Sequence, residues 1–327
     1  MRIYVISHGP SRRPDKMIGW HYIPYILEQR GHKIRIVSKK EWKRFYWEYL
    51  KFKPDVIVSS GIIGAWITLF KKLRLISKKV PHYHAWDDHY VEVMGKKWGP
   101  AMTAFFEYWI VKNADFVSSP SVMLYRQTRQ IGVKNSAFTP HGVYSYANSL
   151  KPIPLPKGKF KVSAVYVGEQ SGAQKNLEKF LLQIRDVACD IYLIGERNPE
   201  LAKFVEVNNI ENIHFLGGKE NKEVIGLLKS ADILLLTPDQ DSCLKMYEYL
   251  KVGKAILGYK GRQGYILSHN ENAYLCEDFN EGLRKLVKDL KLRKRLSTGA
   301  KKFKVLTWEE IARKHLNNME RVVRNRK

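Results

Sequence analysis

A lysine and a glutamate three residues apart are the side chains of this sequence best suited to hold a charged ligand. Lys245 and Glu248 lie in the segment 244–252, whose composition predicts a helix that Gly253 ends. The apolar run 231–238 before it predicts a buried strand that ends in a turn. Residues three apart share a helix face, and open α/β sheets bind their ligands beyond the carboxyl ends of strands. This unit is therefore predicted to hold a charged, sugar-bearing nucleotide.

A second polar cluster follows the predicted strand 79–84 in the first half of the chain. It contains His84, Asp87, Asp88 and His89. Carboxylates and histidines at a strand end suit a general base or a group that orients a substrate hydroxyl. The structural alternative is that Asp88 caps the next helix and the histidines are polar loop residues. A metal site is a weaker alternative, because no helical spacing supports it.

Two loops of the second half add groups that suit phosphate. Residues 169–176 connect a predicted strand, 161–168, to a predicted helix and include Lys175. Small residues before a helix turn backbone N–H groups and the helix N-terminus toward an anion. Residues 258–264 form a second, basic loop that contains Arg262.

The 327 residues contain two successive series of alternating predicted strands and helices, which predicts two α/β domains. The Pro-rich segment 149–159 between the two series is interpreted as the interdomain linker. The other predicted strands are 2–7, 33–38, 54–60, 115–118, 137–140, 190–195, 213–216 and 255–257. The other predicted helices are 20–29, 63–73, 101–112, 121–129, 177–187, 223–229, 281–304 and 308–323.

The chain carries an excess of positive charge that favours an anionic partner. Its formal net charge is +25, and residues 1–150 alone hold 24 Lys and Arg against 10 Asp and Glu. In 39–53, aromatic residues repeat at helical spacing among six basic residues. Such a helix suits an interfacial contact with anionic lipid. An ordinary helix packed on a sheet with a solvated basic face is the favoured alternative, and nucleic acid is the third.

The three cysteines, Cys189, Cys243 and Cys276, are odd in number and widely spaced, which speaks against a disulfide framework and a zinc site. The sequence has no apolar run long enough to span a bilayer, and residues 1–6 read as a strand without a signal-peptide pattern. We therefore expect a cytoplasmic protein, with a peripheral contact to the inner face of the membrane through 39–53.

The second half resembles the retaining GT-B glycosyltransferases of the family 4 type, also described as group 1. The runs 232–238, 244–250 and 253–254 are similar to the family's sugar-nucleotide site. The likeness covers nearly the whole chain, and its weaker matches are Val167-Gly168 with Lys175, Leu193-Ile194-Gly195, Phe215-Leu216-Gly217, Thr307-Trp308, 30–34, 114–118 and 140–143.

This resemblance implies two Rossmann-like domains that face each other across a cleft. Residues 1–150 would form the acceptor side and 151–327 the nucleotide-sugar side, and it stays open whether the C-terminal helix crosses back. The implied reaction is the retaining transfer of a hexose from a nucleoside-diphosphate sugar, such as a UDP-sugar, to a glycan or lipid-linked acceptor. It needs no metal and no cofactor besides the donor. Nucleic acid is not expected as a partner.

The resemblance also implies roles for single residues. Glu248 would accept hydrogen bonds from the ribose hydroxyls, while Lys245 and Lys175 would bind the diphosphate and stabilise charge on the leaving group. His84 matches a histidine near the donor sugar, and Gly19 belongs to a loop that faces the donor phosphates. The implied catalytic set is His84, Asp87, Asp88 and Lys245, and the implied donor site is Gly19, Gly168, Lys175, Gly195, Asp241, Lys245, Glu248 and Arg262.

Two positions depart from the family pattern. The family often carries a Glu eight residues before the second Glu, but position 240 is Gln240. Either Asp241 takes over the contact to the sugar or no carboxylate does. The usual Arg after the glycine of strand 161–168 is absent, and Arg262 is the candidate replacement.

Two other functions remain open. One is a non-catalytic basic protein on a degenerate GT-B scaffold that binds anionic lipid or nucleic acid. The other is a sugar-phosphate isomerase of similar double-Rossmann form. The intact Lys-x-x-Glu unit favours the transferase.

Overall fold

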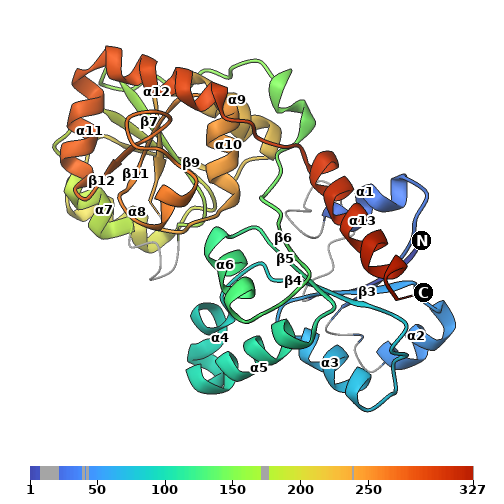
Figure 1. Cartoon of the computed structure of the whole chain (residues 1–327). Coiled ribbons are helices and arrows are strands. Elements are labelled where there is room, and N and C mark those ends of the chain that lie inside the picture. Colours follow the sequence, from blue (N-terminus) through green and yellow to red (C-terminus); the bar gives the residue numbers. More distant parts are fainter. Residues whose placement is uncertain (8–21, 39–40, 42–43, 171–176, 238, 327) are drawn as a thin grey trace. The chain divides into compact units, whose positions relative to one another are not determined.

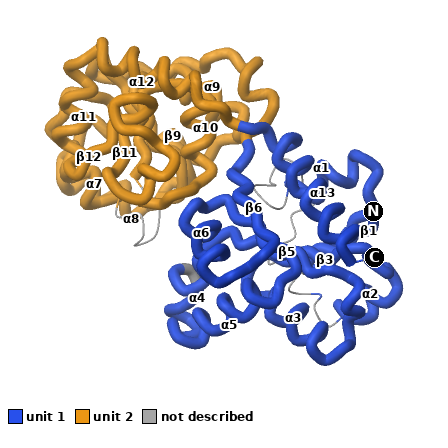
Figure 2. Tube along the Cα trace, in the orientation of Figure 1, with its two compact units in different colours: residues 1–142, 306–327 blue, residues 143–305 orange. Residues whose placement is uncertain are grey.

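The computed structural model describes residues 1–7, 22–38, 41, 44–170, 177–237 and 239–326 (Figure 1). The chain divides into two compact units (Figure 2). Unit 1 comprises residues 1–142 and 306–327, and unit 2 comprises residues 143–305. The sequence suggested a boundary after residue 150, whereas the structure divides the chain after residue 142. The C-terminal helix is part of unit 1. The Pro-rich segment 149–159, interpreted as a linker, lies within unit 2.

Unit 1 is built on a six-stranded parallel sheet in the order β2-β1-β3-β4-β5-β6. Its central strands are buried almost throughout, as expected for a parallel sheet covered on both faces. The strands are β1 (Arg2–Ser7), β2 (Lys33–Ser38), β3 (Val56–Ser60), β4 (His82–Ala85), β5 (Phe116–Ser119) and β6 (Ser136–Phe138).

The helices of unit 1 cover both faces of this sheet (Figure 1). Right-handed crossovers put α1 on one face and the helices that precede β3, β4, β5 and β6 on the other. Helix α13 packs beside α1, and α3 packs beside α5. The helices are α1 (Tyr22–Gln29), α2 (Phe45–Phe52), α3 (Gly64–Lys72), α4 (Tyr90–Trp98), α5 (Pro100–Asn113), α6 (Val122–Gln130) and α13 (Trp308–Arg324).

A buried polar contact fixes α13 to the sheet of unit 1. The Tyr83 hydroxyl lies 2.7 Å from Nδ1 of His315, and both side chains are buried. Burial lowers the pKa of His315 to about 3. Thr307 starts the helix with a capping box that includes Glu310. The C-terminal helix is thus held in unit 1 by a specific hydrogen bond as well as by its apolar face.

Unit 2 repeats the architecture with the strand order β12-β11-β10-β7-β8-β9, again parallel throughout. Its strands are β7 (Ser163–Val167), β8 (Asp190–Ile194), β9 (Ile213–Gly217), β10 (Ile233–Leu236), β11 (Ala255–Tyr259) and β12 (Tyr274–Cys276). Its helices are α7 (Leu177–Ile184), α8 (Pro199–Val207), α9 (Asn221–Ser230), α10 (Leu244–Val252), α11 (Phe279–Lys288) and α12 (Leu290–Lys302), with short 3-10 turns η4 (Ser145–Asn148) and η5 (Arg262–Tyr265).

The prediction of one helix over 281–304 is wrong, because two helices occupy this segment. They meet at Asp289, whose carboxylate accepts a hydrogen bond from the Leu292 N–H at 2.8 Å and caps α12. The sequence also did not predict α4, α8 or β12. Within the described ranges, no helix is both long and apolar enough to cross a membrane.

Candidate functional site

Helix α10 carries Lys245 and Glu248 beyond the carboxyl end of β10, as the sequence predicted. The helix ends at Gly253, whose φ of 71° lies in the left-handed region that suits glycine. Met246, Tyr249 and Leu250 are buried and pack the helix into unit 2. Lys245 and Glu248 are half-buried on another face.

One tyrosine couples this helix to two strand ends. The Tyr249 hydroxyl accepts a hydrogen bond from the Val167 N–H at 3.1 Å and donates one to the Leu235 carbonyl at 3.3 Å. The hydroxyl therefore joins α10 to β7 and β10 in the core of unit 2. This contact fixes where the helix presents Lys245 and Glu248.

Lys245 lies directly against the end of β7. Its Nζ is 4.4 Å from the centroid of the Tyr166 ring, a cation–π contact. A Cβ at Gly168 would come within 2.7 Å of the same Nζ. Gly168 also has a φ of 146°, which side-chain-bearing residues rarely adopt. Position 168 therefore needs glycine both for its backbone conformation and for the approach of the lysine.

Gly195 forms a second close backbone contact at this edge. Its φ is 153°, and a Cβ there would lie 2.0 Å from the Gly168 carbonyl oxygen. The Gly168 N–H donates to Ile194 and the Gly195 N–H donates to Gly217, at 2.9 and 3.0 Å. The ends of β7, β8 and β9 thus form a glycine edge without side chains, of the kind that lets a phosphate approach the backbone.

Glu248 is held by residues that the sequence did not predict. Its Oε1 accepts a hydrogen bond from Nδ2 of Asn221, the first residue of α9, at 2.8 Å. Oδ1 of Asn221 in turn accepts one from the Tyr146 hydroxyl at 2.9 Å. Burial raises the pKa of Glu248, while the Asn221 hydrogen bond and the charge of Lys245 oppose the rise. Asn221 and Tyr146 therefore orient a carboxylate that is partly withdrawn from water.

An ion pair joins the loop between β10 and α10 to the turn η5. Nε of Arg262 lies 3.8 Å from a carboxylate oxygen of Asp239. The turn that carries Arg262 is anchored by buried Gln263, whose amide donates to the Leu236 carbonyl at 2.9 Å. Asp241 is 9% exposed, whereas Gln240 is exposed.

Gln170, two residues after Gly168, stabilises the loop that follows β7. Gln170 is buried, and its side chain contacts the Gly195 carbonyl and the Asn198 N–H at 3.5 and 3.3 Å. Two other predicted residues, Gly19 and Lys175, lie outside the described residues. Their assignments stay predictions.

In unit 1, His84 lies in a buried hydrogen-bond network. Nδ1 of His84 is 2.8 Å from the Ser59 hydroxyl, and Nε2 is 3.1 Å from the Tyr90 hydroxyl. Ser59 also contacts Nε2 of His82 at 2.7 Å. Burial lowers the pKa of His84 to about 3, so the ring is neutral. Both ring nitrogens thus contact protein groups, which is the arrangement of a histidine that positions its neighbours.

Asp87 is the carboxylate of this loop with the most perturbed protonation. It accepts a hydrogen bond from the Ser60 hydroxyl at 2.7 Å. Burial, together with the nearby charge of Asp88, raises the pKa of Asp87 to about 8. Asp88 itself is exposed. A carboxyl group with such a pKa at a strand end is suited to exchange a proton near neutral pH.

Buried Glu107 on α5 fixes the same loop from below. Its Oε1 accepts hydrogen bonds from Nε1 of Trp86 at 2.8 Å and from the Tyr90 N–H at 2.9 Å. Nδ1 of His89 lies 3.6 Å away. This role could not be inferred from the sequence, because Glu107 stands among mostly apolar residues of α5.

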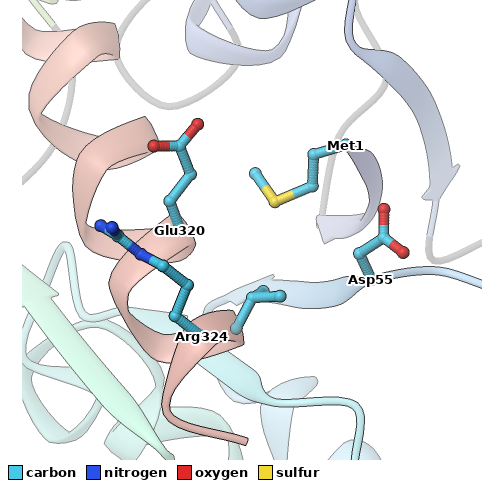
Figure 3. Close-up of a pocket in the computed structure, with 5 residues that line it drawn as sticks. Met1, Asp55, Glu320 and Arg324 are labelled. Atoms are coloured by element: carbon cyan, nitrogen blue, oxygen red, sulfur yellow. The ribbon is translucent and has the colours of Figure 1, made fainter. Parts of the chain in front are cut away.

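A pocket of about 350 Å³ elsewhere in unit 1 involves none of the predicted site residues. Figure 3 shows Glu320 and Arg324 of α13 on one side of it and Met1 and Asp55 on the other. In the described part of the chain, no three His, Cys, Asp or Glu side chains gather in a way that could hold a metal ion.

Two parallel six-stranded sheets, each covered by helices, with a Lys-x-x-Glu helix at the carboxyl edge of the second, define the GT-B class of fold. Residues 161–303 match the family described as glycosyl transferases group 1. An uncharacterized glycosyltransferase of Methanocaldococcus jannaschii is 26% identical over 217 residues. That match covers 63% of this chain and spans only 59% of the relative.

Solved structures share the fold along the whole chain. Sucrose-phosphate synthase of Thermosynechococcus elongatus superimposes with a TM-score of 0.77 at 13% identity, over 99% of both chains. Anabaena HepE in complex with UDP gives 0.73 at 12% identity, over 98% of this chain and 100% of HepE. The predicted GT-B fold is thus confirmed, as is the resemblance to group 1 glycosyltransferases in unit 2.

Proposed function

We propose that this protein transfers a sugar from a nucleoside-diphosphate sugar to an acceptor hydroxyl. The observation that carries the proposal is the position of Lys245 and Glu248 beside the glycine edge of unit 2, inside the matched region 161–303. HepE, which shares the fold, was solved with UDP and with UDP-glucose. A uridine nucleotide is therefore the first donor to test.

Each of the two side chains has a distinct task in this proposal. Lys245 binds the diphosphate and stabilises the negative charge that grows on it as the bond to the sugar breaks. Glu248, oriented by Asn221 at 2.8 Å, accepts hydrogen bonds from the ribose hydroxyls. Gly168 and Gly195 leave the backbone open to the phosphates. Lys175 and Arg262 remain candidates for further phosphate contacts, and Asp241 for a contact to the sugar.

The finer features of the reaction are also proposals. The transfer retains the anomeric configuration and needs no metal, since Lys245 supplies positive charge at the leaving group. The acceptor is a glycan or a lipid-linked acceptor, and His84, Asp87 and Asp88 of unit 1 are the candidates for contacts to the acceptor or to the donor sugar. Among these three, Asp87 has the pKa best suited to receive the proton of the acceptor hydroxyl. The cytoplasmic location stays a prediction.

Nucleotide binding by the whole chain tests the proposal most directly. We expect UDP or another nucleoside diphosphate to raise the melting temperature, and Lys245→Ala and Glu248→Ala to weaken its binding in calorimetry by about tenfold to a hundredfold each. Helix α8 offers a matched control, because exposed Lys203 and Glu206 repeat the same spacing. Alanine variants of that pair should bind as the parent does.

Two results would contradict the assignment. If no nucleoside diphosphate or its sugar shifts the melting temperature, the alternative of a non-catalytic basic protein on a GT-B scaffold gains support. If nucleotides bind but the Lys245 and Glu248 variants bind as well as the α8 variants, the donor site lies elsewhere in the chain.

A further inference from the structure

Nine large apolar side chains are exposed on unit 1 between residues 47 and 108. Trp47 is 66% exposed and Phe105 is 61% exposed, values that are unusual for such side chains. The five comparable residues of unit 2 are scattered from residue 153 to residue 290. We call the unit 1 set the aromatic surface; it comprises Trp47, Leu50, Trp66, Leu73, Leu75, Trp98, Met102, Phe105 and Tyr108.

The helices that carry this surface are neighbours on one face of the sheet (Figure 1). Phe45 of α2 stacks on Phe70 of α3 with ring centroids 5.6 Å apart. Lys72 of α3 lies over the Trp109 ring of α5 at 5.2 Å. The sheet order and right-handed crossovers put α2, α3 and α5 on the same face. Their outward side chains therefore lie on the same side of unit 1.

Helix α5 explains why the surface is not part of the core. Its inner face is already packed, since Thr103, Ile110 and Val111 are buried. Met102 and Phe105 nevertheless form a second apolar row on the outer face, 48% and 61% exposed. A helix that is apolar all round is normally covered on all sides. The outer row therefore calls for a partner from outside the described chain.

The charge around these side chains identifies the chemistry of that partner. From residue 44 to residue 113, the exposed acidic residues are only Asp88 and Glu92 in the described part of the chain. The exposed basic residues in the same range are Arg44, Lys51, Lys53, Lys72, Arg74, Lys78, Lys79, Lys96, Lys97 and Lys112. Such an excess of positive charge beside an apolar surface favours an anionic partner and opposes pairing with a second copy of this chain.

We propose that the aromatic surface docks on the face of an anionic lipid bilayer. Tryptophan and tyrosine prefer the level of the lipid headgroups, and leucine and methionine enter the acyl region below them. The surrounding lysines attract anionic headgroups. Single-stranded nucleic acid fits less well, because Leu50, Leu73, Leu75 and Met102 offer no ring on which a base could stack. This inference does not depend on the proposed sugar transfer.

The surface also revises the prediction for residues 39–53. Residues 39–40 and 42–43 lie outside the described residues. In α2, Phe45 and Tyr49 are buried against unit 1, whereas Trp47 and Leu50 are exposed. One face of this helix is thus ordinary core packing, and only the other face belongs to the docking surface. Most of the surface lies on α3, α4 and α5, which the sequence did not single out for membrane contact.

Vesicle sedimentation of the full chain tests the proposal. We expect binding at low salt to vesicles of equal parts phosphatidylcholine and phosphatidylglycerol, and little binding to phosphatidylcholine alone. Replacing Trp47, Trp66 and Phe105 together by serine should weaken binding on the order of a hundredfold. Val207 and Leu290 of unit 2 are similarly exposed, at 69% and 52%, so their serine variants serve as controls and should bind as the parent does.

A charge series separates headgroup attraction from apolar contact. Lys72→Glu with Lys97→Glu should weaken binding by more than the roughly fivefold expected for losing one basic residue. Lys294→Glu with Arg295→Glu, which makes the same charge change on exposed α12, should act much less. Melting temperatures identify any variant that fails to fold.

Three outcomes would overturn the proposal: no sedimentation with the anionic vesicles, equal effects of the unit 1 and unit 2 variants, or binding to a single-stranded oligonucleotide but not to vesicles. The last outcome would assign the surface to nucleic acid.

Discussion

Asn221→Ala removes the side chain that orients Glu248 and leaves both proposed ligand-binding side chains in place. The lost hydrogen bond, from Nδ2 of Asn221 to Oε1 of Glu248, is 2.8 Å long and involves a carboxylate. A bond to a charged group contributes about 1.5–3 kcal/mol, so we expect UDP affinity to fall by roughly tenfold to a hundredfold. The preceding residue, Glu220, occupies the N-cap position of α9, so the substitution does not remove a capping side chain.

The loss should be specific to the ribose and to acidic pH. The Asn221 bond lowers the pKa of Glu248, so its removal lets that pKa rise further. A carboxylate with a raised pKa loses its charge at higher pH. The variant should therefore lose affinity at a higher pH than the parent when the pH is lowered. A 2′,3′-dideoxy analogue of UDP lacks the hydroxyls that Glu248 would accept from, so the variant and the parent should bind it equally.

Isothermal titration calorimetry with both nucleotides over a pH series makes this measurement. Asn208→Ala is the control, because it removes a side-chain hydrogen bond of the same 2.8 Å length from α8, without a carboxylate partner. Unchanged UDP affinity in Asn221→Ala, or an equal loss for the dideoxy analogue, would refute the reasoning. Failure of the parent itself to bind UDP would instead count against the proposed donor.

Three further substitutions test other parts of the structure. Gly195→Ala places a Cβ 2.0 Å from the Gly168 carbonyl oxygen at a φ of 153°, so thermal unfolding should show a loss of ~3 kcal/mol or more; a loss below 1 kcal/mol would contradict the close contact. Tyr249→Phe leaves the partly buried Val167 N–H without its acceptor and should cost about 1–3 kcal/mol in denaturant unfolding; no change would mean that the hydroxyl does not join α10 to β7. The pKa of Asp87 is raised to about 8 in the folded protein, so its contribution to stability is full below pH 3.8 and is lost as pH rises through 8. Asp87→Asn stays neutral, so its melting temperature, relative to that of the parent, should rise as the pH increases from 3.8 to 8. If the difference between the two melting temperatures does not change with pH, the pKa of Asp87 is not raised.

Local patterns predicted the donor side of unit 2 well. An apolar run sets β10, and a glycine with positive φ ends α10, so both limits depend on residues inside the segment. The same holds for Lys245 and Glu248, whose common face follows from helical spacing alone. Asp289 is a local signal of the same kind, since an Asp before apolar residues at helical spacing can cap a new helix, and it could have divided the helix predicted over 281–304.

Contacts between distant segments could not be predicted in this way. Asn221 is 27 residues from Glu248, and Tyr146 is 75 residues from Asn221. Only the strand order brings them together. The burial of His84 had the same cause. Parallel strands are covered on both faces, so the pattern of polar and apolar residues along β4 does not reveal that His84 contacts the Tyr90 and Ser59 hydroxyls.

The arginine missing after Gly168 changes how positive charge is distributed in the proposed donor site. The side-chain amide of Gln170, near that position, forms hydrogen bonds with the Gly195 carbonyl and the Asn198 N–H and so stabilises the loop. Arg262 lies 3.8 Å from the Asp239 carboxylate, which offsets part of its charge. Lys245 instead faces the Tyr166 ring and the glycine edge, where no Cβ stands between its Nζ and the backbone of Gly168. Among the described residues of this site, phosphate binding should therefore depend more on Lys245 than on Arg262.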